Sequence, residues 1–131
     1  MSRLTIVTPP DILLTNNISF LLIYPSNQIK EQFQDLVESF DNDFTIYLYE
    51  PPEKDEDPDW LLNNCHVANF VVFDIDNSTS IVRDLASYII ANTNTFWLTN
   101  SGDHVYNKLS VNRIYNLDYL KERIGETLEK K

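Results

Sequence analysis

Runs of apolar residues alternate with segments of helical spacing along most of the chain. Residues 18–24 and 70–75 are almost continuously apolar, which indicates strands buried on both faces of a parallel sheet. Residues 44–49 are rich in β-branched and aromatic side chains, as strands are. Shorter strand patterns follow at 95–99 and 111–115. The pattern therefore predicts five core strands.

Apolar residues that recur every three or four positions predict helices between these strands. The helices are expected over residues 28–40, about 60–65, 79–91 and 117–129. Each needs a residue before its first turn whose side chain accepts a backbone N–H. The candidate caps are Ser26 or Asn27, Asp57 or Asp59, and Ser78 or Thr79.

Strands and helices that alternate in this way predict an α/β fold, a three-layer sandwich around a parallel sheet. Five strands favour the flavodoxin-like order 2-1-3-4-5, counted from residues 18–24. Residues 3–7 are strand-like but short, and residues 12–15 are an apolar run that Asn16 and Asn17 separate from the first core strand. Residues 1–17 are therefore expected to add an N-terminal edge strand, with 12–15 as its candidate, or a hairpin that turns at Asn16 and Asn17. With 131 residues and no linker, the chain is expected to form one domain.

Composition removes several classes of function. Gly102 and Gly125 are the only glycines, and phosphate loops need several within a short window, so P-loop NTPases and ordinary dinucleotide enzymes are excluded. His66 and His104 lack the spacing of metal ligands, so we expect neither a metal nor a cofactor. Fourteen asparagines and twelve isoleucines are typical of AT-rich coding DNA, as in phages and some bacteria.

Charge and cysteine content limit the partners and the compartment. Ten Lys and Arg face 20 Asp and Glu, for a net charge of −10, which argues against direct binding of nucleic acid or an anionic membrane. Cys65 is the only cysteine, no signal segment opens the chain, and no apolar run approaches a membrane span. We therefore expect a reducing compartment, the cytoplasm, and for a phage protein that of its host.

Ligands in such sheets bind where the strand order reverses, at the carboxyl ends of the first and third core strands. Asp74 and Asp76 project to the same side of a strand end and could bind a cation or a ribose; alternatively they are strand-end and capping residues. The candidate ligand-binding residues are Tyr24, Ser26, Asn27, Asp74, Asp76 and Ser78.

A longer pattern covers residues 60–99. A helix leads into a strand with an acidic end at 65–76, followed by a turn at 77–80, a helix with a carboxylate at 82–88 and a strand at 96–99. This order resembles the nucleoside 2-deoxyribosyltransferase-like families, with TIR domains as more distant relatives. The resemblance implies a flavodoxin-like fold and a nucleoside or nucleotide site.

In these families the helix after the third strand carries a catalytic glutamate. The matching position is Asp84, one methylene shorter, and the nearest residues to the family's flanking glycines are Ser80 and Ala86. A nucleophilic carboxylate must lie about 3 Å from the carbon it attacks, so the resemblance implies a member that has kept the fold and lost the chemistry. If the chain is an enzyme, Asp84 and Asp74 are the expected catalytic residues.

A second resemblance is to response-regulator receiver domains, in which Asp74 would match the phosphoacceptor and Thr99 the switch threonine. Those domains also need an acidic pair after the first strand to hold Mg²⁺. This chain has Tyr24 and Ser26 there, which makes phosphotransfer the weaker of the two resemblances.

The segment 50–59 holds six acids and one lysine among its prolines. It is either a solubilising loop or a docking edge for a basic protein, with neighbouring aromatic residues as an apolar anchor. We expect a non-enzymatic interaction module of the second kind, with self-association through the apolar edge near residues 3–15 as a further expectation. The candidate protein-binding residues are Tyr49, Glu50, Glu53, Asp55, Glu56, Asp57, Asp59 and Trp60.

Overall fold

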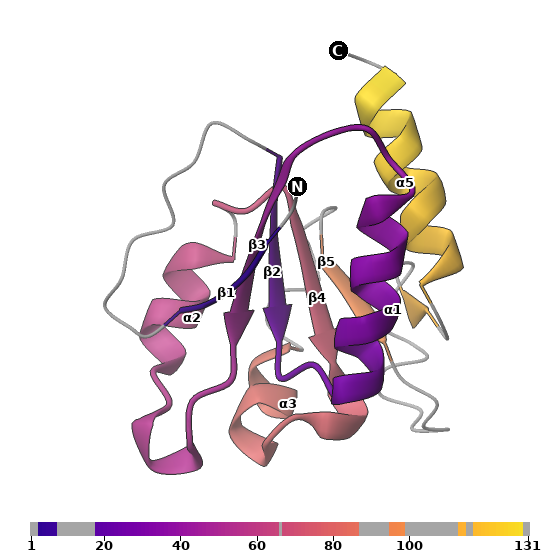
Figure 1. Ribbon diagram of the computed structural model, residues 1–131. Coiled ribbons are helices and arrows are strands. Elements are labelled where there is room, and N and C mark those ends of the chain that lie inside the picture. The colour runs from indigo at the N-terminus through magenta and orange to yellow at the C-terminus, as the bar shows by residue number, and fades with distance from the viewer. Residues whose placement is uncertain are drawn as a thin grey trace.

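Strands and helices alternate in the computed structural model, which describes residues 3–7, 18–65, 67–86, 95–98, 113–114 and 117–129 (Figure 1). The strands are β1 (Arg3–Ile6), β2 (Ile18–Ile23), β3 (Phe44–Tyr49), β4 (Phe70–Asp74), β5 (Thr95–Leu98) and β6 (Arg113–Ile114). The helices are α1 (Asn27–Glu38), α2 (Pro58–Asn64), α3 (Ser80–Ala86) and α5 (Asp118–Glu129), and the 3-10 turns are η1 (Glu53–Asp55) and η2 (Ile75–Asn77).

The described strands form one six-stranded parallel sheet in the order β1-β3-β2-β4-β5-β6. The predicted α/β fold is therefore confirmed. The core strands β2 to β6, numbered among themselves, have the expected order 2-1-3-4-5. The whole sheet differs in detail because β1 adds an outer strand beside β3.

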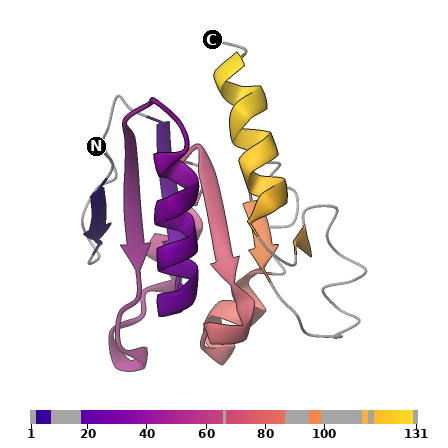
Figure 2. The same ribbon diagram turned by 45° about the vertical axis from the view of Figure 1, so that its right-hand side comes forward.

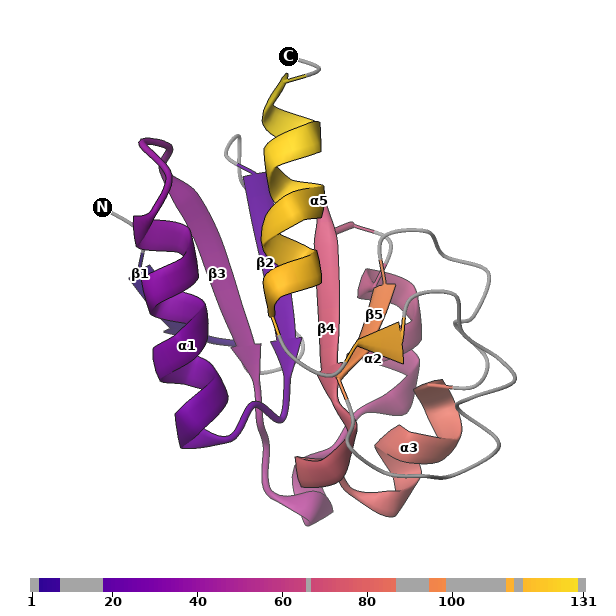
Figure 3. The same cartoon turned by 90° about the vertical axis from the view of Figure 1, so that its right-hand side faces the viewer.

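Helices cover both faces of the sheet, which makes three layers (Figures 2 and 3). Phe20 and Leu22 of β2 point to one face and pack with buried residues of α1 and α5. Leu21 and Ile23 point to the other face, where α2 and α3 pack. Because successive side chains of a strand alternate between faces, a strand covered on both sides is expected to be almost continuously apolar, as β2 is apart from Ser19.

The N-terminal strand confirms one of two expectations. β1 lies parallel to β3, with Leu4 opposite Ile46. The prediction of a hairpin with β2 is wrong over Phe20–Ile23, because β3 and β4 pair with the two edges of β2 there. The candidate run 12–15 lies outside the described residues.

Element ends follow their caps. Ser26 and Asp57 are the N-caps of α1 and α2, each accepting a backbone N–H with its side chain, and Thr79 accepts the Val82 N–H at 3.3 Å before α3. Helix α1 ends at Glu38, two residues earlier than expected, and Ile75 belongs to η2 rather than to a strand. Residues 87–91, His66, His104 and Thr99 lie outside the described residues.

Candidate functional site

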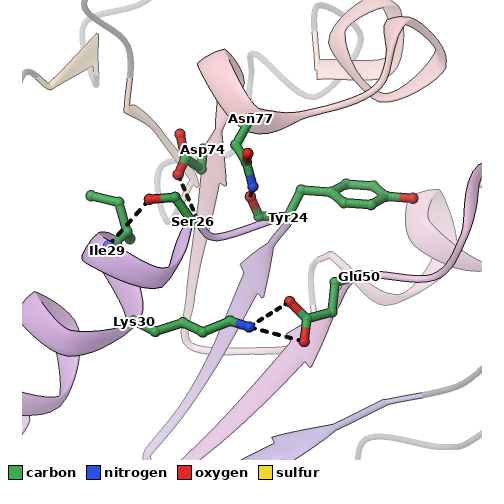
Figure 4. Close-up of polar contacts among 7 residues, drawn as sticks. All are labelled: Tyr24, Ser26, Ile29, Lys30, Glu50, Asp74 and Asn77. Atoms are coloured by element: carbon green, nitrogen blue, oxygen red, sulfur yellow. Dashed lines mark hydrogen bonds and ion pairs between the residues drawn. The ribbon is translucent and has the colours of Figure 1, made fainter.

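The carboxyl ends of β2 and β4 lie side by side because these strands pair in parallel, with Ile23 opposite Phe73. Two hydrogen bonds join the segments that follow them (Figure 4). The Ser26 N–H donates to Asp74 Oδ2 at 3.0 Å, and Asn77 Nδ2 donates to the Tyr24 carbonyl at 2.7 Å. Topology therefore brings the predicted ligand-binding segments together.

Asp74 is the last residue of β4, and its side chain lies beside the start of α1. It is only 6% exposed. Burial raises the pKa of its carboxyl group above the usual value, backbone N–H donors from Ser26 and Asn77 lower it, and the charge of Asp76 raises it further. A carboxylate at a helix N-terminus is favourable because the first N–H groups carry partial positive charge. Asp74 thus supplies an anion from the chain itself at the place where such sheets bind an anionic ligand.

The other members of the predicted ligand set divide into two groups. Ser78 is buried, and its hydroxyl donates to the Asp74 carbonyl at 2.8 Å. Asn27 and Asp76 are exposed. The edge is therefore polar, but its buried polar groups bond to one another.

Asp84 is exposed on α3, whose buried face carries Val82 and Leu85. The catalytic roles expected of Asp84 and Asp74 stay a prediction. Nowhere in the described segments do three histidine, cysteine or acidic side chains come close enough to hold a metal ion.

The acidic loop 50–59 is held against the core at several points. Lys30 Nζ contacts Glu50 Oε2 at 2.8 Å and Oε1 at 3.1 Å (Figure 4). The Tyr24 hydroxyl lies 2.7 Å from both the Pro51 carbonyl and Glu56 Oε1. These contacts fix both halves of the loop.

Aromatic rings form the base of this loop. Tyr49 stacks on Trp60 with centroids 5.5 Å apart, and Tyr24 meets Tyr49 edge-on at 5.8 Å. The Tyr49 hydroxyl accepts the Asp57 N–H at 3.0 Å. Burial raises the pKa of Tyr24 well above its usual range, and the Glu56 carboxylate beside the hydroxyl adds to the effect. Tyr24 also has a positive φ of 51°, uncommon for a residue other than glycine.

These rings correct one expectation. Tyr49 and Trp60 are buried, so neither is an exposed anchor for a partner. Both point into the core between the sheet and α2, where their apolar area is removed from water. Trp60, Leu61 and Leu62 are consecutive in α2, and a helix cannot turn three successive side chains to one face. Leu62 is the one left outside, at 43% exposed.

The six acids of the loop have different surroundings. Glu50 is paired with Lys30, Glu56 is bonded to Tyr24, and the Asp57 side chain accepts the Trp60 N–H at 3.0 Å. The remaining acids, Glu53, Asp55 and Asp59, are exposed. The sequence indicated only the role of Asp57, as a candidate cap. The contacts of Glu50 and Glu56 come from Lys30 and Tyr24, which are far from the loop in the chain.

Comparison with known proteins adds no relative. No family model matches the chain, and neither a curated protein nor a solved structure does. The resemblance of residues 60–99 to the deoxyribosyltransferase-like families stays a prediction. Every helix in the described part of the chain is too short or too polar to cross a membrane.

Proposed function

We propose that the chain is a protein-interaction module that binds a basic segment of a partner protein. The contact surface, called here the acidic surface, consists of Glu53, Asp55, Asp59 and Leu62. One observation carries the proposal: loop 50–59 is fastened to the core through Glu50, Pro51 and Glu56, while the acids of the acidic surface stay exposed. A fixed loop loses little conformational freedom on binding.

Charge and shape favour one class of partner. Asp59 and Leu62 are three residues apart in α2 and therefore lie on the same side of the helix. Glu53 and Asp55 belong to η1, just before this helix. A partner segment with lysine or arginine beside an apolar side chain would pair with the acids and cover Leu62.

The alternative function is binding of a nucleoside or nucleotide between Tyr24–Asn27 and Asp74–Ser78. A phosphate at the start of α1 would have to displace the Asp74 carboxylate from the Ser26 N–H. Thermal denaturation in the presence of nucleosides, nucleotides and NAD tests this alternative. A ligand at 100 times its Kd would stabilise the protein by about 2.7 kcal/mol. Such a shift, changed by Asp74→Asn, would favour this alternative.

Peptide titration tests the proposed function. The probe is a synthetic peptide of alternating lysine and leucine, with a glutamate-leucine peptide as its counterpart, followed by amide NMR shifts and calorimetry. We expect only the basic peptide to bind and to shift the amides of η1 and α2. A triple variant, E53Q/D55N/D59N, is expected to bind about tenfold or more weakly, since each lost charge contact contributes several tenths of a kcal/mol to binding.

A matched control separates a specific surface from net charge. The variant E31Q/D35N/E38Q also removes three exposed acids, in this case from α1, and we expect it to bind like the wild type. Equal weakening by both triple variants would show attraction to net charge alone and would refute the proposal. Absence of binding by the wild type would also refute it.

A further inference from the structure

The hydrogen bonds of β1 show which of its backbone groups face outward. The Val7 N–H donates to the Leu48 carbonyl of β3 at 2.9 Å. Peptide groups alternate in direction along a strand, so residue 5 also faces β3. Leu4 and Ile6 direct their N–H and C=O groups to the opposite edge. The sheet has no described strand beyond that edge.

The side chains of the same two residues are an exposed apolar pair. Leu4 is 36% and Ile6 64% exposed. They lie opposite Ile46 and Leu48, on the side of the sheet that α1 and α5 cover. Figure 2 shows β1 beyond α1 at the margin of the sheet, which explains why the helix does not cover them.

Edge strands are usually protected by charge, proline or a covering segment. β1 begins with the charged residue Arg3, whereas residues 4–7 contain neither a charge nor a proline, and residues 3–7 contain no acid. In a chain with net charge −10, this edge is a place where a second copy can approach without carboxylates meeting carboxylates.

We propose that β1 pairs with β1 of a second copy, antiparallel about a two-fold axis at Thr5. In this register Leu4 lies opposite Ile6 of the second copy, and each such pair exchanges both N–H···O bonds because both residues direct these groups outward. Thr5 faces its own counterpart as a non-hydrogen-bonded pair. Leu4 and Ile6 of both copies then form one apolar strip on a common face, a self-complementary contact as two-fold symmetry requires.

The short strand limits the strength of this dimer. A stable interface buries about 1,600 Å² in total, more than the pairing of strands of this length provides. We therefore expect a weak dimer whose population rises with protein concentration.

Cysteine cross-linking tests the register directly. In a non-hydrogen-bonded antiparallel pair the Cα atoms are about 4.5 Å apart, which a disulfide can span. Thr5→Cys is therefore expected to form a covalent dimer under mild oxidation, about tenfold faster than the control Ile81→Cys on the exposed side of α3. The native Cys65 is 1% exposed and does not compete.

Sedimentation measures the dimer without a cross-link. Ile6→Lys places a charge in each apolar pair, and we expect it to abolish the wild-type dimer, while Ile81→Lys keeps it. A wild-type chain that is monomeric up to its highest workable concentration overturns the proposal and leaves the edge open to a strand of another protein. A dimer that survives Ile6→Lys, with Thr5→Cys no faster than its control, also overturns it.

Discussion

The hydroxyl of Tyr24 connects the end of β2 to the acidic loop, and Tyr24→Phe removes this group alone. The ring and its edge-on contact with Tyr49 remain. The Pro51 carbonyl and Glu56 Oε1 both lose a neighbour at 2.7 Å. Glu56 Oε2 is already buried without a hydrogen-bond partner among the described residues, so the variant deprives this carboxylate of its tyrosine donor.

The expected loss of stability follows from these contacts. A hydrogen bond between neutral groups contributes about 1 kcal/mol, and one to a charged group about 1.5–3 kcal/mol. The hydroxyl has one proton to share, and Glu56 is partly exposed, so we expect a loss of about 2 kcal/mol. For a domain of this size that corresponds to a fall in Tm of about 6–8 °C.

Urea unfolding followed by tryptophan fluorescence measures this loss, since Trp60 stacks on Tyr49 at the base of the loop. Tyr119→Phe is the control: that side chain is exposed, and its hydroxyl accepts a 3.4 Å contact from Arg123. We expect the control to cost less than about 0.5 kcal/mol.

A double-mutant cycle with Glu56→Ala isolates the bond between the two side chains. We expect a coupling free energy of about 1 kcal/mol between Tyr24→Phe and Glu56→Ala. Two results would show that the hydroxyl does not hold the loop. One is a loss of stability in Tyr24→Phe no larger than in Tyr119→Phe. The other is a double variant Tyr24→Phe/Glu56→Ala whose loss of stability equals the sum of the two single losses.

Three further predictions concern the ends of β2 and β4 and the core. Ser26→Ala should lower the free energy of unfolding by about 1 kcal/mol through loss of the α1 cap, and Ser26→Thr should restore most of it in the same urea assay; equal values for both variants would contradict this. Because burial raises the pKa of Asp74, its contribution to stability is fully present below its unfolded pKa, near 3.9, and is lost as pH rises through its folded pKa. The free energy of unfolding of Asp74→Asn, relative to that of the wild type, should therefore increase from about pH 4 to pH 7. The exposed control Asp35→Asn should show a smaller change. If Asp74→Asn and the wild type have parallel pH profiles of stability, the prediction is wrong. Burial raises the pKa of Cys65 to about 12, so an aromatic disulfide reagent should react with the native thiol more than about a hundredfold slower than with the thiol in urea; similar rates would show that the thiol is accessible.

The sequence predicted the features that depend on patterns along the chain. β2 and β4 are almost continuously apolar because helices cover both of their faces, and such a run can be recognised without a structure. The meeting of Ser26 and Asp74 was also predictable, because parallel pairing of neighbouring strands brings their carboxyl ends together whatever side chains they carry.

The burial of Tyr49 and Trp60 could not be read in the same way. Tyr47 and Tyr49 point to the same face of β3, yet Tyr47 is partly exposed and Tyr49 is fully buried. The difference depends on where α2 lies over the sheet, which is a contact between elements and not a local pattern. The run of three apolar residues in α2 signals only that one of them would be exposed, not that it would be Leu62.

The two proposals can be tested separately because they use different residues. The acidic surface follows the carboxyl end of β3, whereas the pairing edge runs along β1. Antiparallel pairing about a two-fold axis would place the acidic surfaces at opposite ends of a dimer, so one short basic segment could contact only one of them. Ile6→Lys should then leave the affinity for the lysine-leucine peptide unchanged. A gain in avidity from the dimer would require a partner long enough to span both acidic surfaces. A loss of peptide binding in Ile6→Lys would show that the acidic surface is not independent of β1.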